Sequence, residues 1–238
     1  QQTLALEAQA LKSLGEQLDD AFVNAVRVIL ACHGRVVVCG LGKTGHVARK
    51  LAATLASTGT PALFMHAAEA LHGDLGMLTA NDVLVALSHS GRGHELLMIL
   101  PSAQRLKVPV IAMTGHPDSD LAKLADIHLH VRVEQEACPL NLAPTTSTTA
   151  ALALGDALAV ATLQARGFNQ EDFARAHPGG ALGRRLITRV RDVMRHGTAL
   201  PTVTEDASVA QALMEISKKG MGMTAVVDHN GRAVGIFT

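Results

Sequence analysis

The sequence predicts an α/β fold, in which a doubly wound, mostly parallel sheet is flanked by helices and followed by a smaller α+β module. Short apolar runs recur up to residue 133, and most are apolar throughout rather than alternating. This pattern is typical of strands buried on both faces of a parallel sheet. Stretches with helical spacing of apolar residues separate the runs, which indicates repeated βαβ units. After residue 190 the strand and helix patterns become shorter.

The elements of the first part follow from these patterns in order. An amphipathic helix is expected over residues 4–30, where apolar residues recur at intervals of three, four and seven. Strands are expected at 35–39, 61–65, 82–87, 108–113 and 127–133. Helices are expected between and after them at 46–57, 94–106, 119–125 and 146–166.

A change of composition divides the chain. The segment 178–183 (PGGALG) contains three Gly and one Pro, which makes it the best candidate for a linker. We therefore expect one domain at 1–184 and a linker with a second, incomplete module at 185–238. The module is expected to contain a strand near 202–203, a helix at 208–219 and strands at 224–227 and 233–237. Asn230-Gly231 lies between the last two strands and is typical of a hairpin turn.

Composition excludes several classes of protein. The 238 residues include 21 basic and 21 acidic side chains, so the chain has no net charge with which to bind a polyanion such as nucleic acid. Trp and Tyr are absent, which removes the aromatic platforms that stack bases. The three Cys form no CxxC pair, so we expect neither disulfides nor structural zinc, and a reduced, cytoplasmic compartment. No signal peptide is expected, and the most apolar stretch, 150–163, is too short to span a membrane.

The first candidate site is the loop Gly40–Gly45 (GLGKTG), which ends the first predicted strand. It matches the GxGxxG fingerprint of dinucleotide sites, but the acid expected after the second strand is replaced by His66, with Glu69 the nearest carboxylate. The P-loop pattern fails because Val37 stands where its first Gly belongs. Glycines here either form a tight turn or let backbone N–H groups approach a phosphate ester.

Two further loops carry hydroxyl groups in front of predicted helices. Ser88-His89-Ser90-Gly91 follows the third strand, and Thr145–Thr149 precedes the long helix. Hydroxyls, backbone amides and a helix N-terminus together can bind a phosphate. Ser90 could equally be an ordinary helix cap. In open α/β sheets, ligands bind at the carboxyl ends of the strands, where these loops are expected.

These loops resemble those of sugar-isomerase (SIS) domains, which bind phosphosugars, and more closely those of D-arabinose-5-phosphate isomerases. The segments that carry the closer resemblance are 41–50 (LGKTGHVARK), 72–76 (HGDLG), 136–140 (EACPL), 142–149 (LAPTTSTT) and 177–183 (HPGGALG). The tail from residue 192 resembles the first half of a tandem CBS pair. The resemblance implies a flavodoxin-like or Rossmann-like SIS domain and a homotetramer.

The implied reaction interconverts D-ribulose 5-phosphate and D-arabinose 5-phosphate through an enediol, feeds Kdo and lipopolysaccharide synthesis, and needs no cofactor. The implied catalytic residues are Lys43, Glu95, Glu136 and His177. Glu136 is the leading candidate for the base that moves the carbon proton, although the two glutamates could exchange roles. Lys43 would polarise the carbonyl or stabilise the enediolate oxygen. His177 would open the sugar ring or carry the oxygen proton.

The substrate phosphate is assigned to the hydroxyl and glycine loops. The residues are Gly42, Thr44, Ser88, Ser90, Gly91, Thr145, Thr146, Ser147 and Thr148. The second loop departs from the family pattern, with His89 where relatives usually have Asn and Arg92 where they usually have Glu. Arg92 reverses a charge near the phosphosugar loop, so it either adds phosphate affinity or disturbs the carboxylate pair.

His66 and His72 lie around the loop after the second strand, and His72 belongs to a segment shared with the family. Any metal held there is expected to be adventitious or an inhibitory zinc ion, and not a catalytic one.

Two other functions compete with the isomerase. A phosphosugar-binding regulator would need only the hydroxyl and glycine loops, so the joint presence of the four implied catalytic residues favours the enzyme. A nucleotide-dependent oxidoreductase is disfavoured by the missing acid after the second strand.

Overall fold

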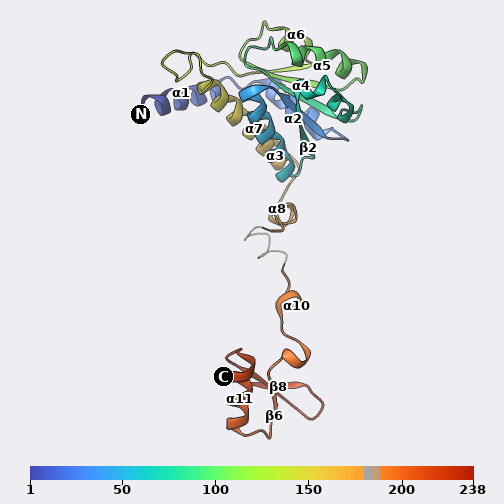
Figure 1. Cartoon of the computed structure of the whole chain (residues 1–238), viewed down its shortest axis with the longest axis vertical. Helices are drawn as coiled ribbons and strands as arrows, with labels where there is room; N and C mark the ends of the chain where they lie inside the picture. Colours follow the sequence, from blue (N-terminus) through green and yellow to red (C-terminus); the bar gives the residue numbers. More distant parts are fainter. Residues whose placement is uncertain (180–184, 186–187) are drawn as a thin grey trace. The chain divides into compact units, whose positions relative to one another are not determined.

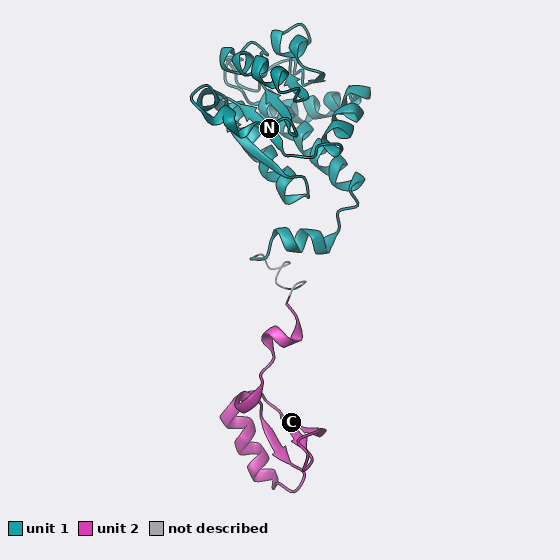
Figure 2. Cartoon of the chain, turned by 90° about the vertical axis from the view of Figure 1, so that its right-hand side faces the viewer, with its two compact units in different colours: residues 1–186 teal, residues 187–238 magenta. Residues whose placement is uncertain are grey.

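The computed structural model describes residues 1–179, 185 and 188–238 and divides the chain into two compact units, 1–186 and 187–238 (Figures 1 and 2). The predicted domain boundary after residue 184 and most of the predicted linker 178–183 lie outside the described residues. Each unit is considered by itself below.

The first unit is built on a five-stranded sheet in which every neighbouring pair is parallel. Its strands are β1 (Val36–Gly40), β2 (Ala62–His66), β3 (Val83–Leu87), β4 (Val110–Thr114) and β5 (Ile127–His130), in the order β2-β1-β3-β4-β5. β1, β3 and β4 are buried at every residue, as their unbroken apolar sequences predict. The strand order is the flavodoxin-like one, which confirms the doubly wound class.

Helices cover both faces of this sheet. One face carries α1 (Gln2–Glu16), α2 (Asp20–Leu30), α3 (Gly42–Ser57) and α7 (Thr146–Ala165), with α3 and α7 side by side (Figure 1). The other face carries α4 (Ala67–Ala70), α5 (His94–Arg105) and α6 (Asp120–Leu124). A 3₁₀ turn, η1 (Asp74–Met77), precedes β3, and α8 (Gln170–Ala176) follows α7. Successive strand residues point to opposite faces, so the sheet separates two apolar clusters.

The N-terminal helix predicted over residues 4–30 is in fact two helices. α1 ends at Glu16, and the Asp19 carboxylate accepts a hydrogen bond of 2.9 Å from the backbone N–H of Ala21 at the start of α2. An Asp at this position competes with helix continuation and favours a new N-terminus.

β5 is also shorter than predicted. It ends at His130, and only the N–H of Val131 still bonds to the sheet, at 2.8 Å from the Thr114 carbonyl. The segment 132–135 therefore leaves the sheet and lines two cavities described below.

One helix in the described part of the chain, α7, is long and apolar enough to cross a membrane by length and composition alone. The apolar stretch 150–163 forms part of this helix, which continues through Gly155 and Asp156 and has 20 residues, as the predicted helix 146–166 implies. Half of its most apolar window is buried, and it packs against α1, α2 and α3. These contacts are those of a core helix.

The second unit contains the elements that the sequence predicts. Its strands are β6 (Thr202–Thr204), β7 (Thr224–Val227) and β8 (Ala233–Phe237), in that order, with the first pair parallel and the second antiparallel. Its helices are α10 (Val190–Val193), the 3₁₀ turn η2 (Gly197–Ala199) and α11 (Val209–Lys219). The Asp228 carboxylate accepts from the N–H groups of Asn230 and Arg232 and closes the β7–β8 hairpin.

Candidate active site

The site lies where the chain leaves β1 and β3, which are neighbours in the sheet. After β1 the chain runs to α3 on one face, and after β3 it runs to α5 on the other. The two connections diverge at the carboxyl ends of the strands, which is where open α/β sheets bind ligands. A cavity of about 480 Å³ opens there and is called the Lys43 cavity below. Its lining includes Leu41, Lys43, Thr44, His89, Val133, Glu134, Gln135, Glu136, Asn141, Leu142, Pro144 and Ser147.

The Glu136 carboxylate is bound at the N-terminus of α7. Its Oε2 accepts hydrogen bonds from the backbone N–H of Thr145 at 2.8 Å, the Thr145 hydroxyl at 3.1 Å and the backbone N–H of Ser147 at 3.2 Å. Its Oε1 accepts from the Ser147 hydroxyl. A helix N-terminus presents free N–H groups and the positive end of the helix dipole, so it is a natural place for an anion. Here that anion is the protein's own carboxylate.

These bonds determine the charge of Glu136. Burial raises the pKa of its carboxyl, but the hydrogen bonds from Ser147 and Thr145 outweigh burial and bring the pKa below its ordinary value of 4.5. The side chain is therefore an anion near pH 7, in the state that a general base requires.

Lys43 lies in the first turn of α3, where its side chain is exposed and lines the cavity. No side chain in the described part of the chain caps this helix, so the N–H groups of its first turn are open to a ligand. The glycines of this loop allow a close approach of backbone to backbone. A Cβ on Gly40 would lie 3.0 Å from the Thr44 carbonyl oxygen, and one on Gly45 would lie 3.2 Å from the Gly40 carbonyl oxygen. The tight turn and an anion site at the helix N-terminus are thus compatible.

His89 forms part of the cavity wall between β3 and β4. Its ring packs on Gly115, where an added Cβ would lie 2.6 Å from the imidazole, and it meets His116 edge to face at 5.7 Å between ring centroids. Burial lowers the pKa of His89, and this effect outweighs the opposite influence of the Glu136 carboxylate. The imidazole is therefore neutral at neutral pH.

The predicted phosphate loop Ser88–Gly91 uses its polar groups largely to hold its own shape. The N–H of Gly91 donates to the carbonyl and to the hydroxyl of Ser88, both at 3.1 Å, and the Ser90 hydroxyl accepts from the N–H of Arg92 at 3.3 Å. Gly91 has φ of 63°, and a Cβ there would lie 2.1 Å from the Ser119 hydroxyl. Ser88 lines a narrow extension of the cavity together with Thr44 and Ser147, whereas Ser90 is exposed and lines neither.

The hydroxyl run before α7 divides among different tasks. Thr145 and Ser147 hold Glu136, and the Thr148 hydroxyl donates to the Thr145 carbonyl at 2.8 Å. Thr146 does not line the Lys43 cavity. In this structure two of the hydroxyls thus bind a carboxylate, and the phosphate-binding role predicted for the run stays a prediction.

The structure brings Lys43 and Glu136 into one cavity but does not place Glu95 or His177 there. Glu95 lies in the first turn of α5, on the opposite face of the sheet from α3 and α7. His177 follows α8, beyond the C-terminal end of α7, and stacks on Phe173 with 4.0 Å between ring centroids. α7 has 20 residues, a length of about 30 Å at 1.5 Å per residue, and Glu136 lies at its other end. Of the four predicted catalytic residues, Lys43 and Glu136 line one cavity, and the catalytic roles of all four stay predictions.

Sequence reasoning missed the part of the cavity contributed by residues 133–135 and 141–144. Asn141 has φ of 52°, and its side-chain oxygen accepts from the Glu136 N–H at 2.7 Å, which fixes the backbone beside the catalytic candidate. An Asn in a turn tolerates this conformation. No motif signalled its position, because the contact depends on how the loop folds back.

The zinc hypothesis stays a prediction. His66 ends β2, and its buried Nδ1 has no hydrogen-bond partner among the described residues, whereas His72 is exposed after α4. Within the described residues, no group of three or more His, Cys, Asp or Glu side chains is placed to hold a metal ion.

The chain is similar to known proteins over its whole length. The SIS domain family matches residues 29–161, and the CBS domain family matches residues 190–238. Arabinose 5-phosphate isomerase KdsD of Pseudomonas aeruginosa is 57% identical over 238 residues, which is 100% of this chain and 73% of that protein. The Escherichia coli K12 protein of the same name is 52% identical over 237 residues, covering 100% and 72%.

A solved structure from Escherichia coli CFT073, described as a complex with A5P, has a TM-score of 0.72 and 41% identity. It covers 74% of this chain and 94% of its own. The whole-length identity, the two domain matches and the flavodoxin-like sheet lead to the same conclusion: this chain belongs to the SIS-domain family of KdsD arabinose 5-phosphate isomerases.

Proposed function

We propose that the chain is an aldose–ketose isomerase that interconverts D-ribulose 5-phosphate and D-arabinose 5-phosphate. The observation that carries this proposal is the joining of an ionised carboxylate, Glu136, and an exposed ammonium group, Lys43, in one cavity at the carboxyl ends of the strands. The curated relatives of that name, 51–57% identical over the whole chain, support the choice of substrate.

The two side chains match the two charges that the reaction develops. The Glu136 carboxylate removes a proton from C1 of the ketose, and the electron pair forms the C1–C2 double bond. The C2 oxygen gains negative charge, which the Lys43 ammonium is placed to stabilise. Return of a proton to C2 and movement of the hydroxyl proton from O1 to O2 complete the aldose. No electron leaves the substrate, so the step needs no redox partner.

The open first turn of α3 supports a phosphate-binding role for this loop. In the described structure the N–H groups of this turn have no side-chain cap, and Lys43 lies in the same turn. The Ser88 hydroxyl lies at the inner end of the site. Thr145 and Ser147 instead hold the base in position. This division of work would orient the sugar with its phosphate at α3 and its reacting carbons toward α7.

The remaining catalytic candidates suggest an assembly. Glu95 and His177, which the family resemblance adds to the site, are not among the residues that line the Lys43 cavity in a single chain, and a homotetramer would let other copies supply them. Size-exclusion chromatography with light scattering should give about four times the chain mass of 24.9 kDa. A particle of one chain mass that still turns over substrate would contradict this assembly.

The product would feed Kdo and lipopolysaccharide synthesis, and we place the enzyme in the cytoplasm. The three cysteines are all free in the structure, in keeping with a reducing compartment.

The test of the function is proton NMR of chelator-treated protein with D-ribulose 5-phosphate in D₂O. We expect D-arabinose 5-phosphate to form with deuterium at C2, because an enediol exchanges its carbon proton with solvent. Phosphorus shifts that show binding without any product would overturn the isomerase and favour a phosphosugar-binding regulator.

A further inference from the structure

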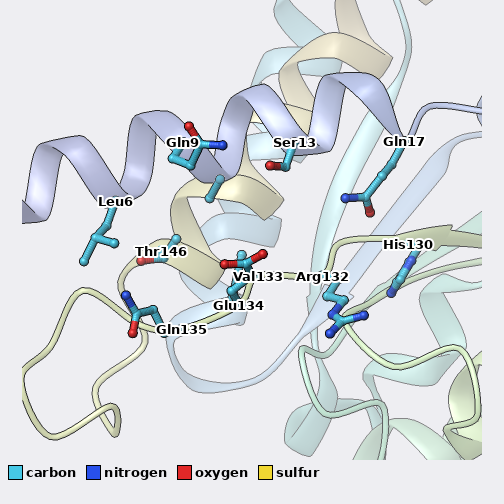
Figure 3. Close-up of a pocket in the computed structure, with 11 residues that line it drawn as sticks. Leu6, Gln9, Ser13, Gln17, His130, Arg132, Val133, Glu134, Gln135 and Thr146 are labelled. Carbon is cyan, nitrogen blue, oxygen red and sulfur yellow. The ribbon is translucent and has the colours of Figure 1, made fainter.

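A second cavity lies between α1 and the segment that follows β5, and it is called the α1 cavity below. Its volume is about 300 Å³ (Figure 3). The side chains of Gln9, Ser13 and Gln17 line it from α1 and its C-cap, and those of Arg132 and Glu134 line it from the opposite wall (Figure 3). This volume is at the lower end of the range for small-molecule sites. None of these side chains belongs to the site proposed for substrate, except that Glu134 lies on the wall between the two cavities.

The strongest sign of a ligand is Thr146. Thr146 is 2% exposed and lines the α1 cavity, yet its buried Oγ1 has no hydrogen-bond partner among the residues that the structure describes. A buried hydroxyl without a partner costs free energy that a polar ligand would recover. The sequence therefore keeps a hydroxyl at a position where Val would fit the same space without that cost.

The other groups of the cavity define the chemistry of such a ligand. His130 Nε2 lies 3.3 Å from the Gly115 carbonyl oxygen, which only accepts, so Nε2 donates this bond, and Nδ1 is the ring atom left for a ligand. The Glu134 carboxylate accepts hydrogen bonds. The side-chain amides of Gln9, Gln17 and Gln135 and the Ser13 hydroxyl can both donate and accept. Several acceptors and donors in a small space match a chain of hydroxyl groups.

The charges of the side chains that line the cavity indicate which acidic group the ligand carries. Arg132 and Glu134 make no ion pair within the described parts of the chain, so the guanidinium is free to bind an anion. A carboxylate fits a guanidinium in a two-point hydrogen bond. With one cation and one carboxylate in the lining, a monoanion leaves a smaller uncompensated charge than a phosphate dianion does.

The α1 cavity also shares structure with the Lys43 cavity. Residues 133–135 line both. Thr146 faces the α1 cavity, and the next residue, Ser147, holds the Glu136 carboxylate. A ligand bonded to Thr146 and Arg132 would therefore restrict the motion of the two segments that position Glu136. These are residues 133–135 and the first turn of α7.

We propose that the α1 cavity is an effector site for a polyhydroxylated monocarboxylic acid, a sugar acid of the aldonate class. The ligand's carboxylate binds Arg132, and its hydroxyls bind Thr146, Ser13 and Glu134. Occupancy restrains Glu136 and slows turnover without excluding substrate. The binding is independent of the proposed isomerase activity, whereas the effect on turnover rests on it.

The test is isothermal titration calorimetry of the whole chain with D-arabinonate, in the presence of saturating D-arabinose 5-phosphate. We expect one binding event per chain that weakens about tenfold or more in Arg132→Gln, as loss of a charge-assisted pair predicts, and that weakens also in Thr146→Val. Arg105→Gln, an equal change at the exposed end of α5, should bind as the unchanged protein does. Uncharged D-arabinitol should not bind measurably.

Kinetics separate the two parts of the proposal. D-arabinonate should lower kcat several-fold with little change in KM, and Arg132→Gln should remove this inhibition while keeping its own basal rate. Displacement of D-arabinonate by the sugar phosphate, or equal binding by Arg132→Gln, would overturn the site, since the acid would then occupy the Lys43 cavity. Binding at Arg132 in a protein without isomerase activity would uphold the site and contradict only the proposed function.

Discussion

Replacement of Glu136 by Gln is expected to lower kcat by about 10²- to 10⁴-fold, the usual contribution of a positioned general base. Gln has almost the same shape, and its amide oxygen can still accept hydrogen bonds from the Thr145 and Ser147 N–H groups. The fold should therefore survive while the proton acceptor is lost. Steady-state kinetics in both directions, with circular dichroism to check the fold, measure the effect.

Glu16→Gln is a matched control, because it removes one exposed carboxylate at the end of α1. Its kcat should equal that of the unchanged chain. If Glu136→Gln keeps kcat and only raises KM, then Glu136 binds substrate hydroxyls, and the proton transfer belongs to another group such as Glu95.

The low pKa of Glu136 predicts the acid side of the pH profile. Hydrogen bonds from Ser147 and Thr145 outweigh burial and hold the pKa below 4.5, so protonation of this group should reduce kcat/KM only below that pH. The stability of the fold changes with pH in the same direction. A carboxyl group whose pKa is lower in the folded than in the unfolded chain stabilises the fold at pH values above the unfolded-state pKa, and this contribution is lost as the pH falls through the folded-state pKa. An acid limb near neutrality that disappears in Glu136→Gln would contradict this assignment.

The same hydrogen bonds raise a question of mechanism. A carboxylate with a low pKa is a weak base toward a carbon proton, since efficiency rises as the pKa approaches the working pH. The four donors at the start of α7 must therefore loosen, or turn toward the substrate, before Glu136 acts. A sugar hydroxyl that took over the Ser147 hydroxyl would remove one of the causes that lower the pKa of Glu136.

The sheet could be predicted because strands that are buried on both faces have apolar residues at nearly every position. The runs around Val36–Cys39, Val83–Leu87 and Val110–Met113 are apolar at nearly every position, and all are fully buried. The break between α1 and α2 was not, because Leu18 and Phe22 continue the apolar spacing across Asp19. The new helix begins because of a local hydrogen bond from a capping side chain, and the spacing of apolar residues does not predict such a bond.

Residues of the cavity that belong to a single loop could be predicted from the sequence, whereas contacts between segments distant in sequence could not. Lys43 and Thr44 follow β1 directly and line the cavity as expected. The face of the sheet on which α5 packs is a tertiary property, and Glu95 at the start of α5 is not among the residues that line the cavity. Thr146 and Ser147 are neighbours in sequence, but successive helical residues point about 100° apart, so they face different cavities.

Replacement of Lys43 by Met is the second change with a large expected effect. Met keeps most of the length of the side chain but carries no charge, so the enediolate oxygen would form without its cation. Loss of one such stabilising group typically costs about 10²- to 10³-fold in kcat. Stopped D₂O incubations followed by NMR would measure both the conversion and the slower exchange of the C1 proton.

Lys50→Met on the same helix separates a local effect from a general one. Lys50 lies seven residues, or about two turns and 10 Å, from Lys43, and its ammonium pairs with Asp156 of α7 outside the cavity. Both variants remove one positive charge from α3, but an exposed ion pair contributes little to stability, so Lys50→Met should retain kcat. Equal losses in the two variants would mean that the overall charge of α3 attracts the substrate. A rise in KM alone in Lys43→Met would mean that Lys43 binds the phosphate in the ground state, because only an interaction that strengthens in the transition state changes kcat.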